Sequence, residues 1–302
     1  MEFSCFIEKL KTLCPEMKLS LNESMAIHTS FRIGGPAAVM AFPESAQQLA
    51  QVVKLAKEKN VPIRILGAGT NVLAPDEGMQ ELVICLKDAM EGMELLDGNR
   101  IRVSAGVTMA RAAVFAANNG LAGMEFAHGI PGTVGGGVYM NAGAYGGEMG
   151  MICESVDVVT SNGEVRTLSK EDMGFSYRHS VLEETFSVVT GVTLQLEPGQ
   201  TEEIRGKMQE LMEKRKTSQP LDKPSAGSAF KRPVGGYAAA LIDQAGLKGF
   251  QVGGAAVSTK HAGFVVNMGG ATAKDVKTLL CEVAKRVKDN SGISIEPEIR
   301  IW

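Results

Sequence analysis

Residues 128–150 read HGIPGTVGGGVYMNAGAYGGEMG and contain nine glycines, no lysine or arginine, and one acidic residue, Glu148. Glycine loses more conformational entropy on folding than any other residue, so a dense cluster indicates a backbone path that a Cβ would block. Successive bare N–H groups in a curled loop bind anions such as a diphosphate. This segment therefore predicts a loop around the phosphates and ring of a nucleotide. The alternative is a tight, glycine-lined turn inside a packed domain.

A second glycine turn lies upstream, where PIRIL (62–66) is expected to form a strand that runs into GAGTN (67–71). A strand followed by GxG is typical of the Rossmann fingerprint. Here position 72 is valine instead of the third glycine, and the next residues do not open a helix, so that interpretation is rejected. The turn is predicted to meet phosphate with its backbone, and an ordinary β-turn is the alternative.

The remaining pattern predicts an α+β protein with two sheets. An N-terminal helix is expected to lead into a polar connector that ends near residue 30. Helical periodicity predicts further helices at 45–60, 109–119, 201–216, 237–245 and around the apolar face from Val276 to Val287. Strands are predicted at 82–86, 101–105, 156–160, 165–168, 187–196, 255–257, 264–266 and 293–302. Asn162-Gly163 suits a type I′ hairpin turn.

The chain has 302 residues and 44% apolar content. A single core stops growing at about 250–300 residues, so two domains are expected. The joint is placed at EPGQT (197–201), which gives a domain of residues 1–196, with lobes of about 1–65 and 66–196, and a domain of residues 197–302. The 31 basic and 34 acidic residues are well mixed and give a formal charge of −3, which indicates no nucleic-acid or membrane-surface partner.

The N-terminal residues lack a basic region followed by an apolar run of about 7–15 residues, so no secretory signal is predicted. No apolar segment approaches the ~20 residues that span a bilayer. Five scattered cysteines without CxxC spacing indicate reduced thiols and a cytoplasmic location. The four histidines show no ligand spacing, so no metal site is predicted.

Six motifs follow one another from about Phe31 to the C-terminus: LGAGTNVL, GIPGTVGGGVYMNAGAYGGEM, FSYRHS, PSAGSAFKRP, GLKGFQVGGAAVSTKHAGFVVN and EPEIR. Together they closely resemble the UDP-N-acetylenolpyruvoylglucosamine reductase family, flavoenzymes of peptidoglycan precursor synthesis. The resemblance implies a vanillyl-alcohol-oxidase-type (PCMH) FAD-binding domain and a smaller α+β substrate-binding domain, with the C-terminal strand returning to the active site. The short chain between Tyr177 and the strand at 187–196 resembles the form that lacks an extra substrate-covering loop.

The resemblance implies that loop backbone holds the FAD. The implied cofactor-binding residues are Gly67, Ala68, Gly69, Thr70, Asn71, Pro131, Gly132, Thr133, Val134, Gly135, Asn141 and Gly143. Some relatives attach FAD to a histidine near the first glycine turn, but GAGTN has none, so the FAD is expected to be non-covalent.

The implied reaction reduces the enolpyruvyl ether of UDP-N-acetyl-enolpyruvoylglucosamine to the lactyl ether of UDP-N-acetylmuramate. NADPH reduces the flavin, and a hydride then passes to the terminal CH₂ carbon. Negative charge builds on the carbon next to the carboxylate and spreads into that carboxylate. The site therefore needs cationic or hydrogen-bonding groups on this enolate and a proton donor over the adjacent carbon.

The family motifs carry three candidate catalytic residues onto this chain. Arg178 is expected to clamp the enolate with its guanidinium fork, unless it is a solvated loop arginine. Ser228 is the candidate proton donor, helped electrostatically by Lys231, unless it only forms a hydrogen bond in a turn. Glu298 would donate a hydrogen bond if it were protonated, or would orient Arg178. The alternative is an exposed residue on the last strand, on the same face as Glu296.

The same motifs imply that Tyr145 contacts the substrate, with Arg215 and Lys231 as candidates for its phosphates or carboxylate. Arg232 stands where many relatives have asparagine. His179 has no assigned role, and His261 is interpreted as a structural histidine rather than a base. The expected protein is a cytoplasmic monomer. Two alternatives remain: an FAD alcohol or sugar oxidase of the same fold, and a catalytically inactive flavin- or nucleotide-sugar-binding protein.

Overall fold

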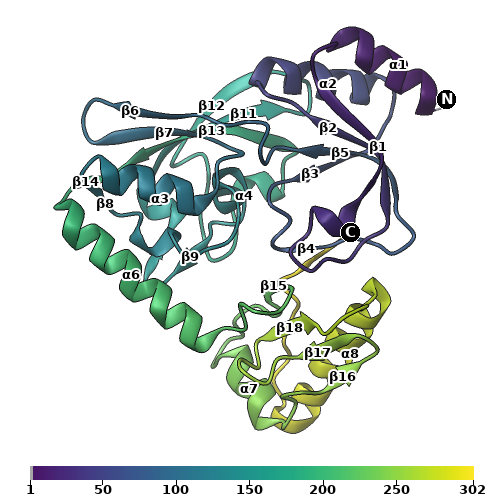
Figure 1. The fold of residues 1–302 in the computed structure, drawn as a ribbon, viewed down its shortest axis with the longest axis vertical. Coiled ribbons are helices and arrows are strands. Elements are labelled where there is room, and N and C mark those ends of the chain that lie inside the picture. The colour runs from purple at the N-terminus through teal and green to yellow at the C-terminus, as the bar shows by residue number, and fades with distance from the viewer. Residues whose placement is uncertain (1–2) are drawn as a thin grey trace. The chain divides into compact units, whose positions relative to one another are not determined.

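The structure, a computed structural model, describes residues 3–302 and separates the chain into two units, each with its own hydrophobic core. The first unit contains the residues up to Leu21, Val39–Ala68 and Gln80–Glu213. The second contains Asn22–Ala38, Gly69–Met79 and Lys214–Trp302 (Figure 1). These units are defined by packing, so the assignment of residues 1–196 and 197–302 to cofactor and substrate binding stays a prediction.

A five-stranded antiparallel sheet with the order β12-β11-β13-β7-β6 is the centre of the first unit. Its strands are β6 (Met93–Leu96), β7 (Arg100–Ser104), β11 (Cys153–Thr160), β12 (Val165–Ser169) and β13 (Ser187–Gln195). The central β13 is buried from 188 to 192, because it has a neighbour on each side and a helix, α4 (Val134–Tyr139), against it. The helix α3 (Met109–Asn118) packs against α4.

The predicted hairpin at 156–168 is confirmed, but its turn type is wrong. Thr160 donates to Glu164 O, and Gly163 donates to Thr160 O. Gly163 has φ +75°, while Asn162 has no positive φ. A type I′ turn needs a positive φ at both central residues, so the loop is longer than the Asn-Gly pattern indicates.

A second sheet has the order β1-β2-β5-β3. Its strands are β1 (Lys18–Ser24), β2 (Pro36–Phe42), β3 (Ile63–Leu66) and β5 (Met79–Cys85). The polar connector expected after helix α1 (Phe3–Leu13) is thus in part the strand β1. β3 and β5 are parallel, and no helix connects them, which agrees with the rejection of a Rossmann unit. The helix α2 (Ala46–Glu58) lies within the predicted range of 45–60, and its cap Ser45 accepts the N–H of Gln48.

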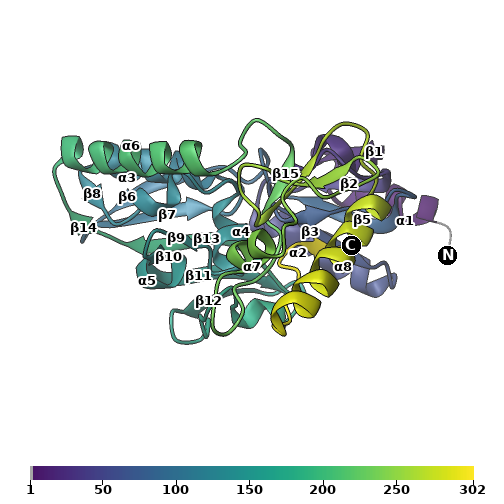
Figure 2. The same ribbon diagram turned by 90° about the horizontal axis from the view of Figure 1, so that it is seen from below.

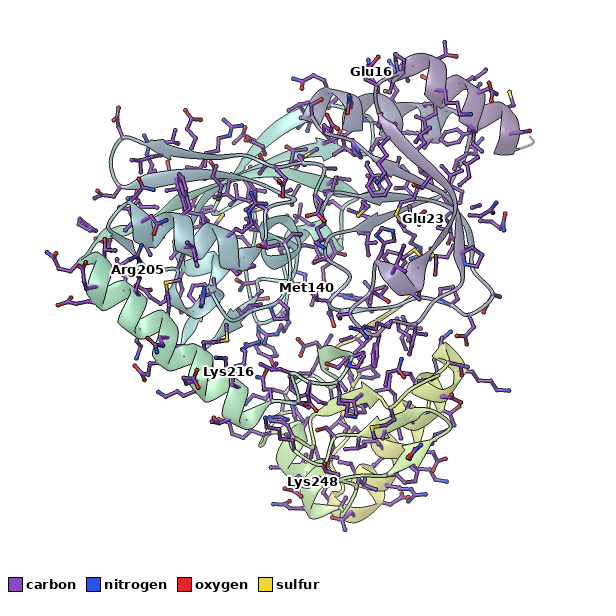
Figure 3. All side chains as sticks on the ribbon, viewed as in Figure 1. Glu16, Glu23, Met140, Arg205, Lys216 and Lys248 are labelled. Carbon is purple, nitrogen blue, oxygen red and sulfur yellow. The ribbon has the colours of Figure 1, made fainter. Side chains whose placement is uncertain are left out.

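The long helix α6 (Thr201–Ser218) begins in the first unit, beside the end of α3 (Figure 2). Thr201 Oγ1 donates to Ala117 O at 3.1 Å, and Arg205, labelled in Figure 3, donates to Asn118 Oδ1 at 2.7 Å. These bonds join α6 to α3 through the last residues of α3. The short strands β8 (Leu121–Ala122) and β14 (Glu197–Pro198) pair next to this contact.

The second unit has a four-stranded antiparallel sheet in the order β15-β18-β17-β16, with two helices in the same core. Its elements are β15 (Ser225–Ser228), α7 (Ala238–Gln244), β16 (Gln251–Val252), β17 (Ala255–Val257), β18 (Phe264–Asn267) and α8 (Ala273–Ser291). The apolar face predicted for α8 is buried. Thr272 and Asp275 form a capping box, and Asp76 accepts two further N–H groups at the same helix end.

The terminal strand predicted over 293–302 is wrong for most of its length. Only β19 (Arg300–Ile301) is a strand, and it pairs in parallel with β4 (Val72–Leu73). Pro297 has no N–H for a ladder and forms a single bridge with Phe230. No helix in the described residues is long and apolar enough to cross a membrane.

Candidate active site

The glycine-rich segment 128–150 folds into three short elements rather than one open loop. They are the helix α4, a hairpin of β9 (Gly143–Ala144) and β10 (Gly147–Glu148), and the helix α5 (Met149–Ile152). Most of the glycines are there because protein atoms pack against them. A Cβ would lie 2.5–2.9 Å from other protein atoms at each of Gly135, Gly137, Gly143, Gly147 and Gly150. Tight packing, the alternative weighed above, therefore explains these five positions.

Gly136 is the exception within α4. It is exposed, and the nearest atom to an added Cβ is Thr133 Oγ1 at 3.4 Å, an ordinary contact. Glycine in a helix is about 1 kcal/mol less favourable than alanine, so packing gives no reason to keep glycine here. Close approach of a ligand to the backbone is the remaining physical reason. Sequence reasoning missed Gly136, because three consecutive glycines look alike without coordinates.

The first glycine turn reaches the start of α4 within the first unit. A Cβ on Gly67 would lie 2.6 Å from Thr133 Oγ1, so the two segments are in close contact. The backbone N–H groups of Gly67, Ala68, Gly132 and Thr133 find no acceptor anywhere in residues 3–302. Unpaired backbone donors gathered in this way can bind an anion.

Val134 and Gly135 differ from these residues, although both were predicted to bind the cofactor. The N–H of Val134 donates to Val107 O at 2.8 Å, and that of Gly135 donates to Ala105 O at 3.0 Å. Their amides therefore hold α4 against the sheet. The N–H groups that remain available are those of Gly67 and Ala68 in the first glycine turn and of Gly132 and Thr133 just before α4.

Tyr145 and Arg178 lie on two neighbouring turns of the first unit. Tyr145 and Gly146 connect β9 to β10 with φ +54° and +87°, the pattern of a type I′ turn, and the tyrosine ring is exposed. Arg178 is the second central residue of a turn closed by Ser176 and His179. Its guanidinium donates to Gly143 O at 3.4 Å and lies 5.1 Å from the centre of the Tyr177 ring.

The backbone of Arg178 is strained. Its φ is +55°, in the left-handed region that costs an L-residue about 1–2 kcal/mol. Such strain is found where the surrounding structure enforces it, and it is concentrated at functional sites.

Ser228 and Glu298 lie on adjacent segments of the second unit. The N–H of Glu298 donates to Ala229 O, and the N–H of Lys231 donates to Glu296 O, both at 2.9 Å. Ser228 is exposed at the end of β15, and its hydroxyl forms no hydrogen bond with any described residue. The alternative that Ser228 only stabilises a turn therefore loses its support.

The end of the first glycine turn, residues 69–71, belongs to the second unit and contacts the segment that carries Glu298. Asn71 Nδ2 donates to Glu298 O at 3.2 Å, and Asn71 O accepts the N–H of Arg300 at 3.0 Å. Gly69 has φ +62°, and a Cβ there would lie 2.0 Å from His28 O. The turn that was predicted to meet the cofactor thus also fixes the backbone that carries Glu298.

The other predicted residues are placed as follows. Arg215 lies in the last turns of α6, half-buried, and Lys231 is half-buried next to the bridge at Phe230. Arg232 lies 4.1 Å from the centre of the Tyr237 ring. His179 is in contact with Glu184, at 3.2 Å. The described residues contain no group of three or more His, Cys, Asp or Glu that could hold a metal ion.

His261 is half-buried, and its contacts support the structural interpretation. Its Nδ1 accepts the N–H of Gly263 at 3.1 Å, and its ring meets Phe264 edge-on at 5.0 Å. Burial lowers the pKa of His261 below its usual 6.5, and burial lowers the pKa of His128 in the same direction.

These two histidines predict how stability depends on pH. Above pH 6.5 both the folded and the unfolded chain hold neutral imidazoles, so the two histidines do not reduce the free energy of unfolding. As the pH falls below 6.5 the unfolded chain binds protons first, and the free energy of unfolding decreases. Denaturant unfolding at about pH 7.5 and about pH 5.5 checks this. His261→Gln should reduce the difference between the free energies of unfolding at the two pH values. An unchanged difference would contradict the assignment.

Comparison with known proteins gives consistent matches along the chain. Residues 219–302 match the model of the C-terminal domain of UDP-N-acetylenolpyruvoylglucosamine reductase, and residues 36–169 match that of an FAD binding domain. The chain is 46% identical over 295 residues to the UDP-N-acetylenolpyruvoylglucosamine reductase of Caldanaerobacter subterraneus subsp. tengcongensis, covering 98% of this chain and 97% of that one. It is 42% identical over 295 residues to the enzyme of the same name from Streptococcus thermophilus, covering 98% and 96%.

Solved structures agree. The crystal structure of UDP-N-acetylenolpyruvylglucosamine reductase from Thermus caldophilus matches with a TM-score of 0.80 at 37% identity, covering 95% of this chain and 99% of that one. An alkyldihydroxyacetonephosphate synthase matches with a TM-score of 0.50 at 18% identity, covering 66% of this chain and 41% of that one. The second likeness concerns the fold alone.

Proposed function

The chain belongs to the UDP-N-acetylenolpyruvoylglucosamine reductase family, and from this premise we propose that it reduces UDP-N-acetyl-enolpyruvoylglucosamine to UDP-N-acetylmuramate with NADPH and FAD. The predicted fold class, α+β with a vanillyl-alcohol-oxidase-type FAD-binding domain, is confirmed by the family and structure matches. The reaction belongs to peptidoglycan precursor synthesis. We place the enzyme in the cytoplasm as a monomer that acts on a small nucleotide-sugar substrate.

The first unit fits a flat, anionic cofactor. The unpaired N–H groups of Gly67, Ala68, Gly132 and Thr133 suit a diphosphate, which needs donors but no positive side chain. Gly136 adds an exposed backbone surface without a Cβ. These residues would hold FAD, and when bound it supplies the hydride, taken from NADPH, for the terminal CH₂ carbon of the enolpyruvyl group.

The chain's own residues would stabilise the negative charge of the enolate and supply the proton. Hydride addition places negative charge on the substrate's carboxylate, where the guanidinium of Arg178 would stabilise it through two parallel hydrogen bonds. Ser228 would deliver the proton to the carbon next to the carboxylate, and the ammonium of Lys231 would favour the alkoxide left behind. Glu298 would hold the substrate carboxylate as a hydrogen-bond donor.

The observation that carries this assignment is the hydroxyl of Ser228. It is exposed, it forms no hydrogen bond with the described residues, and the adjacent backbone is bonded to Glu298. A hydroxyl that has no partner and lies next to the segment carrying Glu298 is available to a substrate. The guanidinium of Arg178 donates to Gly143 O of the glycine-rich segment, which supports a role for this cation in the same reaction.

The test is anaerobic flavin spectroscopy of the purified protein. We expect the protein to be yellow, NADPH to bleach it, and the enolpyruvyl substrate to restore the absorbance without oxygen. Restoration by oxygen alone, together with indifference to NADPH, would indicate the oxidase. Ligand binding without any bleaching would indicate the inactive binding protein. A protein unable to take up FAD would overturn the proposal.

Gly136→Ala should separate stability from cofactor binding. Alanine is favoured over glycine in a helix, and the site has room for the methyl group. We therefore expect the apoprotein to gain about 1 kcal/mol of unfolding free energy. The methyl group would occupy the surface proposed for FAD, so the FAD dissociation constant should rise. Thermal unfolding of the apoprotein and FAD titration measure the two effects, and unchanged FAD affinity would contradict this placement.

A further inference from the structure

The turn that carries Arg178 is held at both ends by hydrogen bonds from buried side chains. Asn141 Nδ2 donates to Ser176 O, the first residue of the turn, at 2.9 Å. Ser180 Oγ, directly after the turn, donates to Tyr139 O at 2.8 Å. Asn141 and Ser180 are both 0% exposed. The conformation of the turn is therefore set from the glycine-rich segment, which lies more than thirty residues earlier in the chain.

Asn141 is itself held in one orientation. Its Oδ1 accepts the N–H of Gly150, the second residue of α5, at 2.8 Å. Its backbone has φ +43°, a conformation that asparagine tolerates better than most residues. Because one end of the amide must donate and the other must accept, neither aspartate nor a rotated asparagine would satisfy both partners.

The same contacts argue against a direct role of this side chain in cofactor binding. Asn141 was predicted to bind FAD, but its side chain is buried and both of its ends are bonded to backbone. Its position lets it act on Arg178 instead. The guanidinium of Arg178 donates to Gly143 O, two residues after Asn141, so its side chain contacts the same segment that bonds Ser176 and Ser180 on either side of it.

We propose that Asn141 and Ser180 are positioning residues that hold the Arg178 guanidinium in place for the carboxylate of the substrate. The inference rests on the proposed reductase function. The two hydrogen bonds fix both ends of the turn in which Arg178 has its positive φ, and the position of that turn aims the side chain. A misplacement of about 1 Å at a catalytic group can cost about 10²-fold in rate, so the loss of either anchor reaches the chemistry without removing a catalytic atom.

The test compares Asn141→Asp and Ser180→Ala with Thr190→Val. Thr190 is buried in the same unit and donates to Asp157 O at 3.2 Å, so its variant loses a similar hydrogen bond away from the turn. For the first two variants we expect normal FAD content, normal flavin reduction by NADPH and a fall of about 10–100-fold in kcat/KM for the enolpyruvyl substrate. Thr190→Val should keep kcat/KM close to that of the parent protein.

A double-mutant cycle with Arg178→Ala separates positioning from a general structural effect. If the anchors act through Arg178, then adding either change to Arg178→Ala should lower kcat/KM by less than about twofold. Full additivity would overturn the proposal, as would loss of bound FAD in both single variants. If Asn141→Asp does not fold, Ser180→Ala carries the test. Failure of the unmodified protein to turn over the substrate would instead refute the proposed function.

Discussion

Replacing Ser228 by alanine should slow the reoxidation of reduced flavin by the enolpyruvyl substrate about 10²–10⁴-fold, the usual effect of removing a positioned proton donor. Flavin reduction by NADPH should stay close to normal, because no proton is delivered to a carbon in that half-reaction. The variant should also keep its stability, since the hydroxyl is exposed and forms no hydrogen bond with the described residues. Anaerobic stopped-flow absorbance measures the two half-reactions separately.

Ser225→Ala is the matched control, because Ser225 lies on the same strand, β15, and its side chain has no hydrogen bond within the described residues. It should change neither half-reaction. If Ser228→Ala slowed both half-reactions equally, then Ser228 would be a binding residue and not the proton donor. If it slowed neither, water or another side chain would deliver the proton.

Replacing Arg178 by alanine should lower kcat/KM for the enolpyruvyl substrate about 10²–10³-fold, the range found when one donor to a developing anion is removed. Arg178→Lys should recover part of this loss, because an ammonium keeps the charge but not the two-pronged geometry. FAD content should be unchanged, since the predicted donors to the diphosphate are backbone N–H groups elsewhere. Steady-state kinetics and flavin absorbance together check these expectations.

Arg166→Ala provides the control, because Arg166 is an exposed arginine of the same unit that pairs with Glu164. Its loss should leave kcat/KM unchanged. Equal activity of Arg178→Ala and the parent protein would contradict the enolate clamp. An Arg178→Lys variant as active as the parent would show that charge matters and that the guanidinium fork does not.

Local sequence patterns were sufficient for the long helices and for the strands β3, β5, β7, β11, β12, β13, β17 and β18, whereas β1, β2, β6 and β15 were not predicted. The apolar face of α8 is visible in the sequence, because helix periodicity acts over three to four residues. The terminal segment was predicted less well, since its alternating apolar residues suggest a longer strand. Pro297 and the few partners available limit that strand to Arg300–Ile301.

In the candidate site, too, some residues can be predicted from the sequence and others depend on the folded structure. Ordered motifs predict Arg178, Ser228 and Glu298 as candidates, because the proposed chemistry demands particular side chains in particular surroundings. They do not reveal Gly136, although it lies in GTVGGGVYM, or the anchoring role of Ser180, although it lies in FSYRHS. Either role depends on what lies opposite the residue in space: an open surface for Gly136, and Tyr139 O for Ser180.

Residue type and order alone establish the family, the fold class, the helices with their caps and the need for an unusual backbone at residues 128–150. The folded chain was required to tell the glycines that make room for protein atoms from Gly136, which faces open space within α4. It was also required to show that the turn of Arg178 is strained and held from the glycine-rich segment. Periodicity and capping depend on neighbours along the chain, whereas close packing and buried hydrogen bonds depend on partners that only folding brings near.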